Sequence, residues 1–169
     1  MMKIFKDSIE NFYKWVKGTE LVELTEIDIT EDPVRPELSL EWRLAHGRKI
    51  FGLCYENTIQ GIICVAFTNE MPNTVKELEL MSELAELKNE KNIAIAYTVW
   101  SRKRGAGKEI ISKVLKYAAD QGIGRVVTLS PLSPMATHFH VKNGARLVSI
   151  NETTQNFEYK ILQKNTRKG

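Results

Sequence analysis

The stretch YTVWSRKRGAGKEIISKVL, residues 97–115, decides the fold predicted for this chain, because it passes from a strand through a basic loop into a helix. Its first residues belong to an apolar run, 92–100, of the kind that is buried on both faces of a sheet. Its last residues repeat apolar side chains every three or four positions, which predicts an amphipathic helix over 105–121. The glycines and cations between the two elements indicate an anion-binding turn.

The chemistry of this turn follows from the start of the helix. A helix N-terminus presents unpaired N–H groups and a partial positive charge. Gly105, Ala106 and Gly107 let a bulky anion approach the backbone. Four cations surround the turn: Arg102, Lys103, Arg104 and Lys108. A diphosphate suits such a site, although a helix with a solvated basic edge is the alternative. The glycine patterns of P-loops and of Rossmann folds are both absent.

Elements on both sides of this stretch alternate between helix and strand. The predicted helices are 6–18, 37–47, 74–87 and a short one after residue 133, and the predicted strands are 21–29, 125–129, 145–150 and 156–162. The clearest hairpin is KIFGLCYENTIQGIICVAF, residues 49–67, with its polar tip at Glu56–Thr58. This order predicts an α/β fold of the α+β type, with a mixed central sheet flanked by helices. We expect a single domain over 1–169, with its core at about 48–162.

Composition narrows the function classes. The chain has 169 residues, 43% hydrophobic and 27% charged, which is ordinary for one globular domain. A net charge of +3 is too small for a general nucleic-acid protein, and no apolar run suits a membrane span. We therefore expect neither a nucleic-acid nor a membrane partner, and a cytoplasmic location. Cys54 and Cys64 are predicted to be buried free thiols in a reducing compartment, with a disulfide as the alternative if their two runs pair.

A second stretch, LSPLSPMATHFHVKNGARL, residues 129–147, holds two of the three histidines. On a helix His138 and His140 lie on different stripes, so His138 is predicted to be at the surface. Ser133 is predicted to cap the helix, because it stands at its start. Ser130 is favoured as a functional residue, with an ordinary Ser-Pro turn as the alternative. His140 is either a catalytic group or a helix histidine satisfied by a backbone carbonyl.

The first stretch resembles the GNAT acetyltransferase superfamily. Arg102-x-x-Gly105-x-Gly107 after a long strand is similar to the family signature Gln/Arg-x-x-Gly-x-Gly/Ala. The resemblance implies that this loop holds the pyrophosphate of an acyl-coenzyme A. It also implies that the preceding strand splays from its neighbour and that its backbone pairs with the pantetheine arm. The order of elements over about 50–162 fits the family's order.

The second stretch resembles malonyl-CoA decarboxylases more specifically. Where many GNAT acetyltransferases carry a tyrosine, this chain has His140. LSPLSP followed by ATHFHVKNGARLVSIN is similar to the serine and histidine segments of the decarboxylases. The resemblance implies that Ser130 and His140 are catalytic, with Tyr159 as the counterpart of a family tyrosine. Those enzymes are much longer, and here only Pro131–Ser133 separates the two segments.

These residues suit two reactions. Decarboxylation of a malonyl thioester makes an enolate, whose oxygen needs hydrogen-bond donors and whose carbon needs a proton from a group such as histidine. Acetyl transfer to an amine or another acceptor needs similar groups. We therefore expect an enzyme that uses malonyl-CoA or acetyl-CoA, without a metal. A malonyl-CoA decarboxylase-like lyase is favoured over an acetyltransferase, and a non-catalytic acyl-CoA-binding module is the third alternative. The sequence leaves open whether the chain forms a homodimer.

Overall fold

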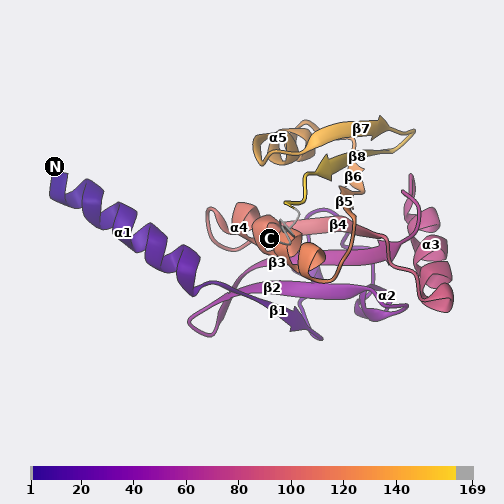
Figure 1. Ribbon diagram of the computed structural model, residues 1–169, viewed down its shortest axis with the longest axis horizontal. Coiled ribbons are helices and arrows are strands. Elements are labelled where there is room, and N and C mark those ends of the chain that lie inside the picture. Colours follow the sequence, from indigo (N-terminus) through magenta and orange to yellow (C-terminus); the bar gives the residue numbers. More distant parts are fainter. Residues whose placement is uncertain (1, 163–169) are drawn as a thin grey trace, which may run out of the picture.

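The computed structural model describes residues 2–162 and contains one eight-stranded mixed sheet (Figure 1). The strands are β1 (Glu20–Leu24), β2 (Lys49–Tyr55), β3 (Thr58–Thr68), β4 (Ile93–Ser101), β5 (Arg125–Thr128), β6 (Ser130–Pro131), β7 (Arg146–Ile150) and β8 (Thr154–Tyr159). Their order is β1-β2-β3-β4-β5-β8-β6, and β7 pairs with β8. This arrangement confirms the predicted α/β fold with a mixed sheet.

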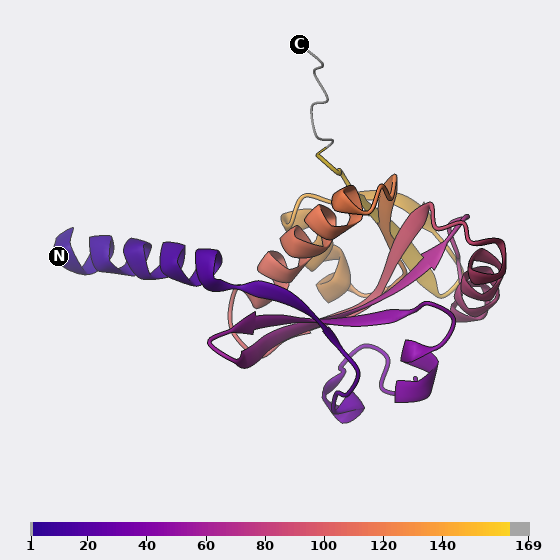
Figure 2. The same cartoon turned by 60° about the horizontal axis from the view of Figure 1, so that its bottom comes forward.

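Helices cover both faces of this sheet. They are α1 (Met2–Gly18), α2 (Leu40–Leu44), α3 (Val75–Lys88), α4 (Ala106–Asp120) and α5 (Pro134–Lys142), with the short 3-10 helix η1 (Ile29–Glu31) before α2. Figure 2 shows α4 and α5, in orange, on one face and α2, in purple, on the other. No helix of the described chain combines the length and the apolarity needed to cross a bilayer.

Two apolar cores lie on the two faces of the sheet. Alternate residues of β3 and β4 point to opposite sides, as strand geometry requires. Ile63, Val65 and Ala94 join α4 in the first core, while Ile62, Cys64 and Ile95 join Leu78 of α3 in the second. Strand β4 is therefore buried on both faces, as predicted. Cys54 and Cys64 are both free thiols, and Cys64 is buried as predicted, whereas Cys54 is only half-buried because it lies near the end of β2.

The sheet opens beside β4, and this opening positions the candidate site. Strand β4 runs parallel to β5 only over Ile93–Ala96, paired with Arg125–Thr128. The last backbone bond between the two sides runs from Leu129 N to Ala96 O, at 3.0 Å. At this point the pairing of β4 with β3 skips Tyr97, which forms a bulge. Beyond Ala96 strand β4 no longer pairs with β5: Tyr97 O instead accepts from Arg35 Nε, and residues 98–101 leave their β5 side unpaired.

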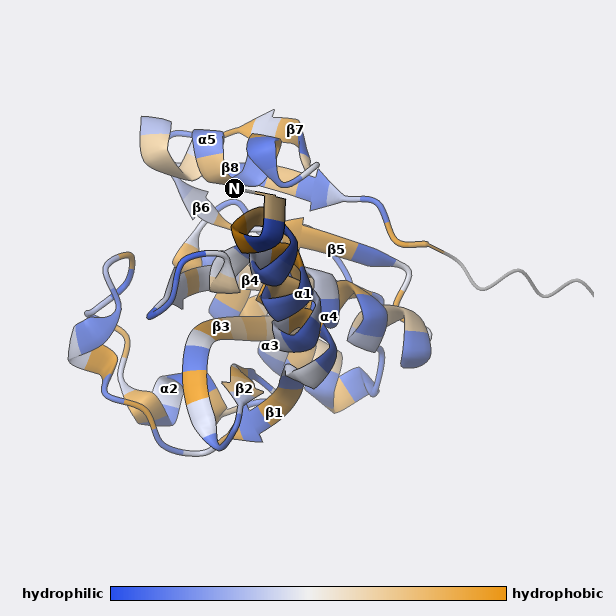
Figure 3. Ribbon diagram, turned by 90° about the vertical axis from the view of Figure 1, so that its left-hand side faces the viewer, coloured by the Kyte–Doolittle hydropathy of each residue, from blue (hydrophilic) through white to orange (hydrophobic). Residues whose placement is uncertain are grey.

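Helix α1 extends away from the body of the protein (Figures 1 and 2). Only its last turn is anchored, through the buried Trp15, whose Nε1 donates to Gln60 Oε1 at 2.5 Å. The rest of its apolar side is exposed: Met2, Ile4, Phe5, Ile9, Phe12 and Tyr13. Figure 3 shows that its hydrophilic and hydrophobic residues lie on different sides of the helix.

Three local predictions need correction. Helix α1 begins at Met2, four residues before the predicted start at residue 6. The strand predicted over 21–29 ends at Leu24, because Asp28 instead caps η1 by accepting from Thr30 N. The two-residue strand β6 was not predicted, since nothing in a Ser-Pro pair indicates a strand.

Candidate active site

The start of helix α4 has the geometry of an anion site. Gly105 is its N-cap residue, with φ of +88°, and no side chain caps the helix. Within residues 2–162, the amide groups of Gly105, Gly107 and Lys108 donate no hydrogen bond. Such unpaired amides at a helix N-terminus attract an anion. Glycine is required at position 105 because a positive φ strains other residues.

Two aromatic side chains border this helix start. A Cβ atom at Gly107 would lie 3.0 Å from Phe139 of α5 and 3.4 Å from Ser101 Oγ. A Cβ atom at Gly105 would lie 4.0 Å from Trp15. The missing side chain at Gly107 therefore allows α5 to approach closely, a packing role that sequence reasoning did not assign to it, whereas a Cβ atom at Gly105 would make only an ordinary contact with Trp15.

The four predicted cations do not all face this turn. Arg102 pairs with Glu31, with 2.9 Å from Nη2 to Oε2. Lys103 Nζ lies 4.6 Å from the centroid of the Trp15 ring, in a cation–π contact. Arg104 and Lys108 are exposed and contact no acid within the described chain. These two side chains are the cations available to an anion at the helix start.

His140 lies on the α4 side of the sheet, buried between α5 and β8. Its Nδ1 is 2.7 Å from the phenol oxygen of Tyr159. Its ring stacks on Phe157 at 5.2 Å between centroids and meets Phe139 edge-on at 5.0 Å. The structure therefore brings together His140 and Tyr159, two of the predicted site residues, and satisfies the ring through a side chain. His138 is exposed, as predicted.

Burial determines the charge of this pair. It lowers the pKa of His140 to about 4 and raises the pKa of Tyr159 above its usual range. At neutral pH the imidazole is therefore neutral, and one of its nitrogens carries a proton. If the phenol donates to Nδ1, that proton is on Nε2. The group thus differs from an ordinary histidine, whose pKa lies near 6.5.

The lowered pKa of His140 predicts a pH-dependent stability. The unfolded histidine, with its pKa near 6.5, takes up a proton before the folded one as the pH falls. The contribution of this group to stability is full above pH 6.5 and is lost as the pH falls towards 4. We expect His140→Asn to remove up to about 1.4 kcal/mol per pH unit from the slope of unfolding free energy in this window. Urea titrations at several pH values measure the slope. His138→Ala should keep the wild-type slope, and an unchanged slope in His140→Asn would contradict the assignment.

Ser130 is buried at the other end of β8. Its Oγ lies 2.8 Å from Thr128 Oγ1, which in turn accepts from Phe157 N at 3.1 Å. The backbone of Ser130 pairs with Gln155, whereas His140 contacts Phe157 and Tyr159. No hydrogen bond joins Ser130 to His140 among the described residues. The cap role predicted for Ser133 is confirmed, since its Oγ accepts from Ala136 N.

Sequence reasoning missed a buried polar cluster on the opposite face of the sheet. Asp32 and Arg43 form an ion pair of 2.7 Å with both side chains inaccessible to solvent. Asp32 also accepts from Thr98 of β4, and Arg35 contacts the backbones of β4 and β5. The sequence gives little signal for this cluster. Arg35 lies between Pro33 and Pro36 in a segment that resembles an ordinary surface loop, and Arg43 lies in the predicted helix that follows.

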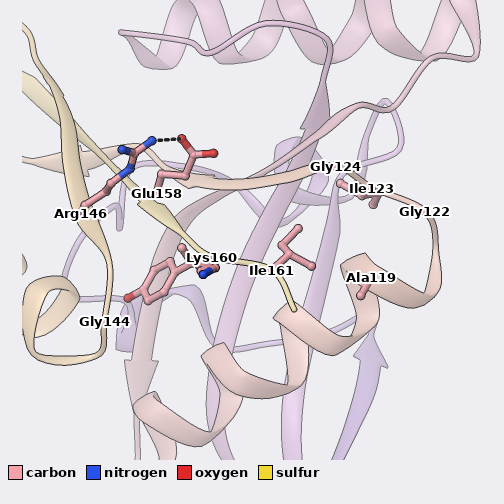
Figure 4. Close-up of a pocket in the computed structure, with 10 residues that line it drawn as sticks. Ala119, Gly122, Ile123, Gly124, Gly144, Arg146, Glu158, Lys160 and Ile161 are labelled. Atoms are coloured by element: carbon pink, nitrogen blue, oxygen red, sulfur yellow. Dashed lines mark ion pairs between the residues drawn. The ribbon is translucent and has the colours of Figure 1, made fainter. Parts of the chain in front are cut away.

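A cavity of about 780 Å³ lies between α4 and β8 (Figure 4). Its walls come from the end of α4, the turns that contain Gly122, Gly124 and Gly144, and the end of β8. Arg146 and Glu158 point toward one another at its edge, 3.8 Å apart. Tyr159 also lines the cavity, so its phenol borders this space on one side and His140 on the other.

The divided sheet and the open helix start beside it define an acyltransferase-type α/β fold. The chain belongs to the acetyltransferase (GNAT) family, whose family model matches residues 9–145. This match confirms the fold expected from the resemblance. No curated protein matches the chain.

Solved structures place the chain beside two kinds of protein. A malonyl-CoA decarboxylase from Rhodopseudomonas palustris aligns with a TM-score of 0.61 at 16% identity, covering 94% of this chain and 64% of that one. A malonyl-CoA decarboxylase from Cupriavidus metallidurans gives 0.52 at 21%, covering 78% and 36%. A Bacillus subtilis acetyltransferase, solved in complex with CoA, gives 0.59 at 12%, covering 85% and 98%. The chain spans less than two thirds of either decarboxylase. At these identities the likeness shows the shared fold.

Proposed function

We propose that this protein binds malonyl-CoA and converts it to acetyl-CoA and carbon dioxide. The observation that carries the proposal is the buried hydrogen bond between His140 and Tyr159, on the face of the sheet where α4 begins. In this proposal the acyl end of the CoA thioester lies beside this pair, which offers it a proton. Similarity to malonyl-CoA decarboxylase structures supports the same reaction at the level of fold.

The CoA portion binds at the start of α4. Its diphosphate accepts from the unpaired amides near Gly105 and Gly107 and meets the cations Arg104 and Lys108. The pantetheine arm pairs with the free edge of β4 beyond Tyr97, where neither β5 nor Arg35 occupies the backbone groups. Phe139 lies beside this path, because it packs on Gly107.

The decarboxylation step breaks the bond between the α-carbon and the carboxylate of the malonyl group. The bonding electrons move onto the thioester oxygen as an enolate, and carbon dioxide leaves. Ser130 donates to the developing charge. Its hydroxyl proton is free for this purpose when Thr128 is the donor in their 2.8 Å hydrogen bond.

The α-carbon then takes a proton from His140 Nε2. Nδ1 of the same ring takes the proton of the Tyr159 hydroxyl, 2.7 Å away. Water in the cavity between α4 and β8 returns a proton to Tyr159, which lines that cavity. One proton is consumed per turnover, as the reaction requires. Tyr159, which lines the cavity and contacts the imidazole, thus links the buried His140 to solvent protons.

Acetyl transfer is the second candidate, supported by the acetyltransferase family match. Transfer to an amine is helped by a general base, which removes a proton from the acceptor. An imidazole with a pKa of about 4 is a weak base, and no carboxylate contacts His140 within residues 2–162. The pair is therefore better suited to protonating an enolate than to deprotonating an amine.

Incubation with malonyl-CoA and with acetyl-CoA, each followed by mass spectrometry, tests the proposal. We expect malonyl-CoA to become acetyl-CoA with no acceptor added. Free CoA formed from acetyl-CoA only when an amine is present would instead support the transferase. Binding of CoA without turnover in either assay would support the non-catalytic module.

The diphosphate site makes a separate prediction about affinity. Removing two charge-assisted contacts in Arg104→Ala/Lys108→Ala is expected to weaken CoA binding by roughly tenfold or more. Titration calorimetry at low and high salt measures this change, and the difference should shrink as salt screens the charges. Lys116→Ala is the matched control, because Lys116 pairs with Asp120 in the last turns of the same helix. Equal affinities for the double variant and the control would place the diphosphate elsewhere.

A further inference from the structure

The guanidinium of Arg35 lies across the opening of the sheet, on the face opposite His140. Its Nε donates to Tyr97 O of β4 and its Nη2 donates to Leu129 O beyond β5, both at 2.9 Å. These two carbonyls stand at the point where the two strands separate. Arg35 is 8% exposed, and two hydrogen bonds to rigid backbone fix its orientation.

The charge of Arg35 has no counterion in contact. The charges of Glu37 and Asp32 both favour the charged form of Arg35, but Glu37 is exposed and forms no ion pair with it among the described residues. The two carboxylate oxygens of Asp32 accept from Arg43, Thr98 and the backbone amides of Val34 and Arg35. Within the described chain no carboxylate forms an ion pair with the Arg35 guanidinium. The buried group of Asp32, Arg35 and Arg43 therefore carries one excess positive charge, which the exposed Glu37 favours without an ion pair and which an anion in direct contact would stabilise further.

One nitrogen of this guanidinium is free to bind. Nη1 donates no hydrogen bond to any residue of 2–162, whereas Nε and Nη2 both do. It is not among the unpartnered polar atoms sealed inside the protein, which are Tyr97 Oη and Trp100 Nε1. Burial also lowers the pKa of Arg35, which shows how far the group is removed from water. If Arg35 only held the two strands together, its bonds to Tyr97 O and Leu129 O would be sufficient, and Nη1 would need no ligand.

We propose that Arg35 is the anion subsite of the acyl pocket and selects thioesters whose acyl group ends in a carboxylate. A thioester that follows β4 to the opening has His140 on one face of the sheet and Arg35 on the other. A carboxylate on the acyl group then meets Nη1 and compensates the excess charge. This inference rests on the proposed binding of an acyl-CoA along β4, but it does not depend on whether the carboxylate is later lost.

Matched pairs of ligands test this subsite on the wild-type protein. Succinyl-CoA and butyryl-CoA have the same number of acyl carbons and differ in the terminal carboxylate, and malonyl-CoA and propionyl-CoA form the same kind of pair. Succinyl-CoA is the primary probe, because it lacks the β-carboxylate whose loss would consume the ligand during a titration. We expect calorimetry to give 10- to 100-fold tighter binding for the carboxylate member of each pair.

Two variants locate the source of that preference. Arg35→Gln should lose it, while Arg35→Lys should keep part of it. Arg48→Gln is the control, since Arg48 is equally buried and also lacks a carboxylate contact, but it donates to Trp42 O and Ser82 Oγ away from the opening. Binding of unmodified CoA and the melting temperature are recorded for each protein.

The outcomes separate this inference from the proposed function. A carboxylate preference in the wild type that Arg35→Gln removes and Arg48→Gln keeps would support the subsite. CoA binding with equal affinity for both members of each pair would overturn it and leave the CoA site standing. A preference that survives Arg35→Gln would overturn it as well. If no CoA ester binds, the proposed function itself fails. If Arg35→Gln does not fold, the affinities of the wild-type protein for the ligand pairs and those of Arg35→Lys still test the subsite.

Discussion

The His140→Ala variant is expected to decarboxylate malonyl-CoA roughly 10²- to 10⁴-fold more slowly than the wild type, because a positioned proton donor typically contributes this factor. The loss should appear in kcat with little change in KM, since the imidazole is proposed to act on the enolate after binding. Acetyl-CoA formation measured by mass spectrometry gives the rate. CoA affinity should stay within a few-fold of the wild type, which confirms that the variant is folded.

Two further variants make this result specific. His138→Ala should keep wild-type activity, because this side chain is exposed on the same helix and differs from His140 only in the face on which it lies. Tyr159→Phe removes the hydroxyl that contacts Nδ1 and should slow turnover without changing CoA affinity. Wild-type turnover in His140→Ala, with CoA still bound, would remove His140 from the mechanism.

Replacing Asp32 by alanine is expected to lower the free energy of unfolding by about 3–5 kcal/mol, because it leaves the buried charge of Arg43 without its partner. The ion pair is fully shielded from solvent, and Asp32 also fixes Thr98 of β4 through a bond of 2.8 Å. Urea unfolding measures the change. The double variant Asp32→Ala/Arg43→Met should recover part of the loss, since both charges are then absent.

The neighbouring residue Glu31 supplies the control for this measurement. Its ion pair with Arg102 is exposed, with side-chain accessibilities of 38% and 41%. Glu31→Ala should therefore cost less than about 1 kcal/mol. Similar losses of unfolding free energy for Glu31→Ala and Asp32→Ala would mean that burial does not determine how much these ion pairs contribute to stability.

Much of the fold could be predicted because periodicity and local turn chemistry agree along the chain. The hairpin of β2 and β3 follows from two β-branched runs around Glu56 and Asn57, which both adopt positive φ in the turn. The end of α3 is likewise determined by local sequence, since Asn89 takes the left-handed conformation that often ends a helix. Helix α4 follows from one apolar stripe, and its start follows from glycines that the turn requires.

The contacts that shape the site could not be predicted in the same way. The bond between His140 and Tyr159 joins residues from α5 and β8, and their spacing in sequence has no regular period. The burial that lowers the pKa of His140 depends on Phe139 and Phe157, which any core would accept. Arg35 was missed because a loop residue becomes a buried cation only when β4 and β5 separate beneath it.

The anchoring of α1 through a single turn makes its outer half dispensable for folding. Its apolar residues before Phe12 contribute no core contact, while Trp15 completes the first core. A shortened protein that starts at residue 11 should thus melt close to the full-length temperature and stay monodisperse at higher concentration. Shortening this helix would then raise the solubility of the protein without lowering its melting temperature, which makes the shortened form the better choice for crystallisation.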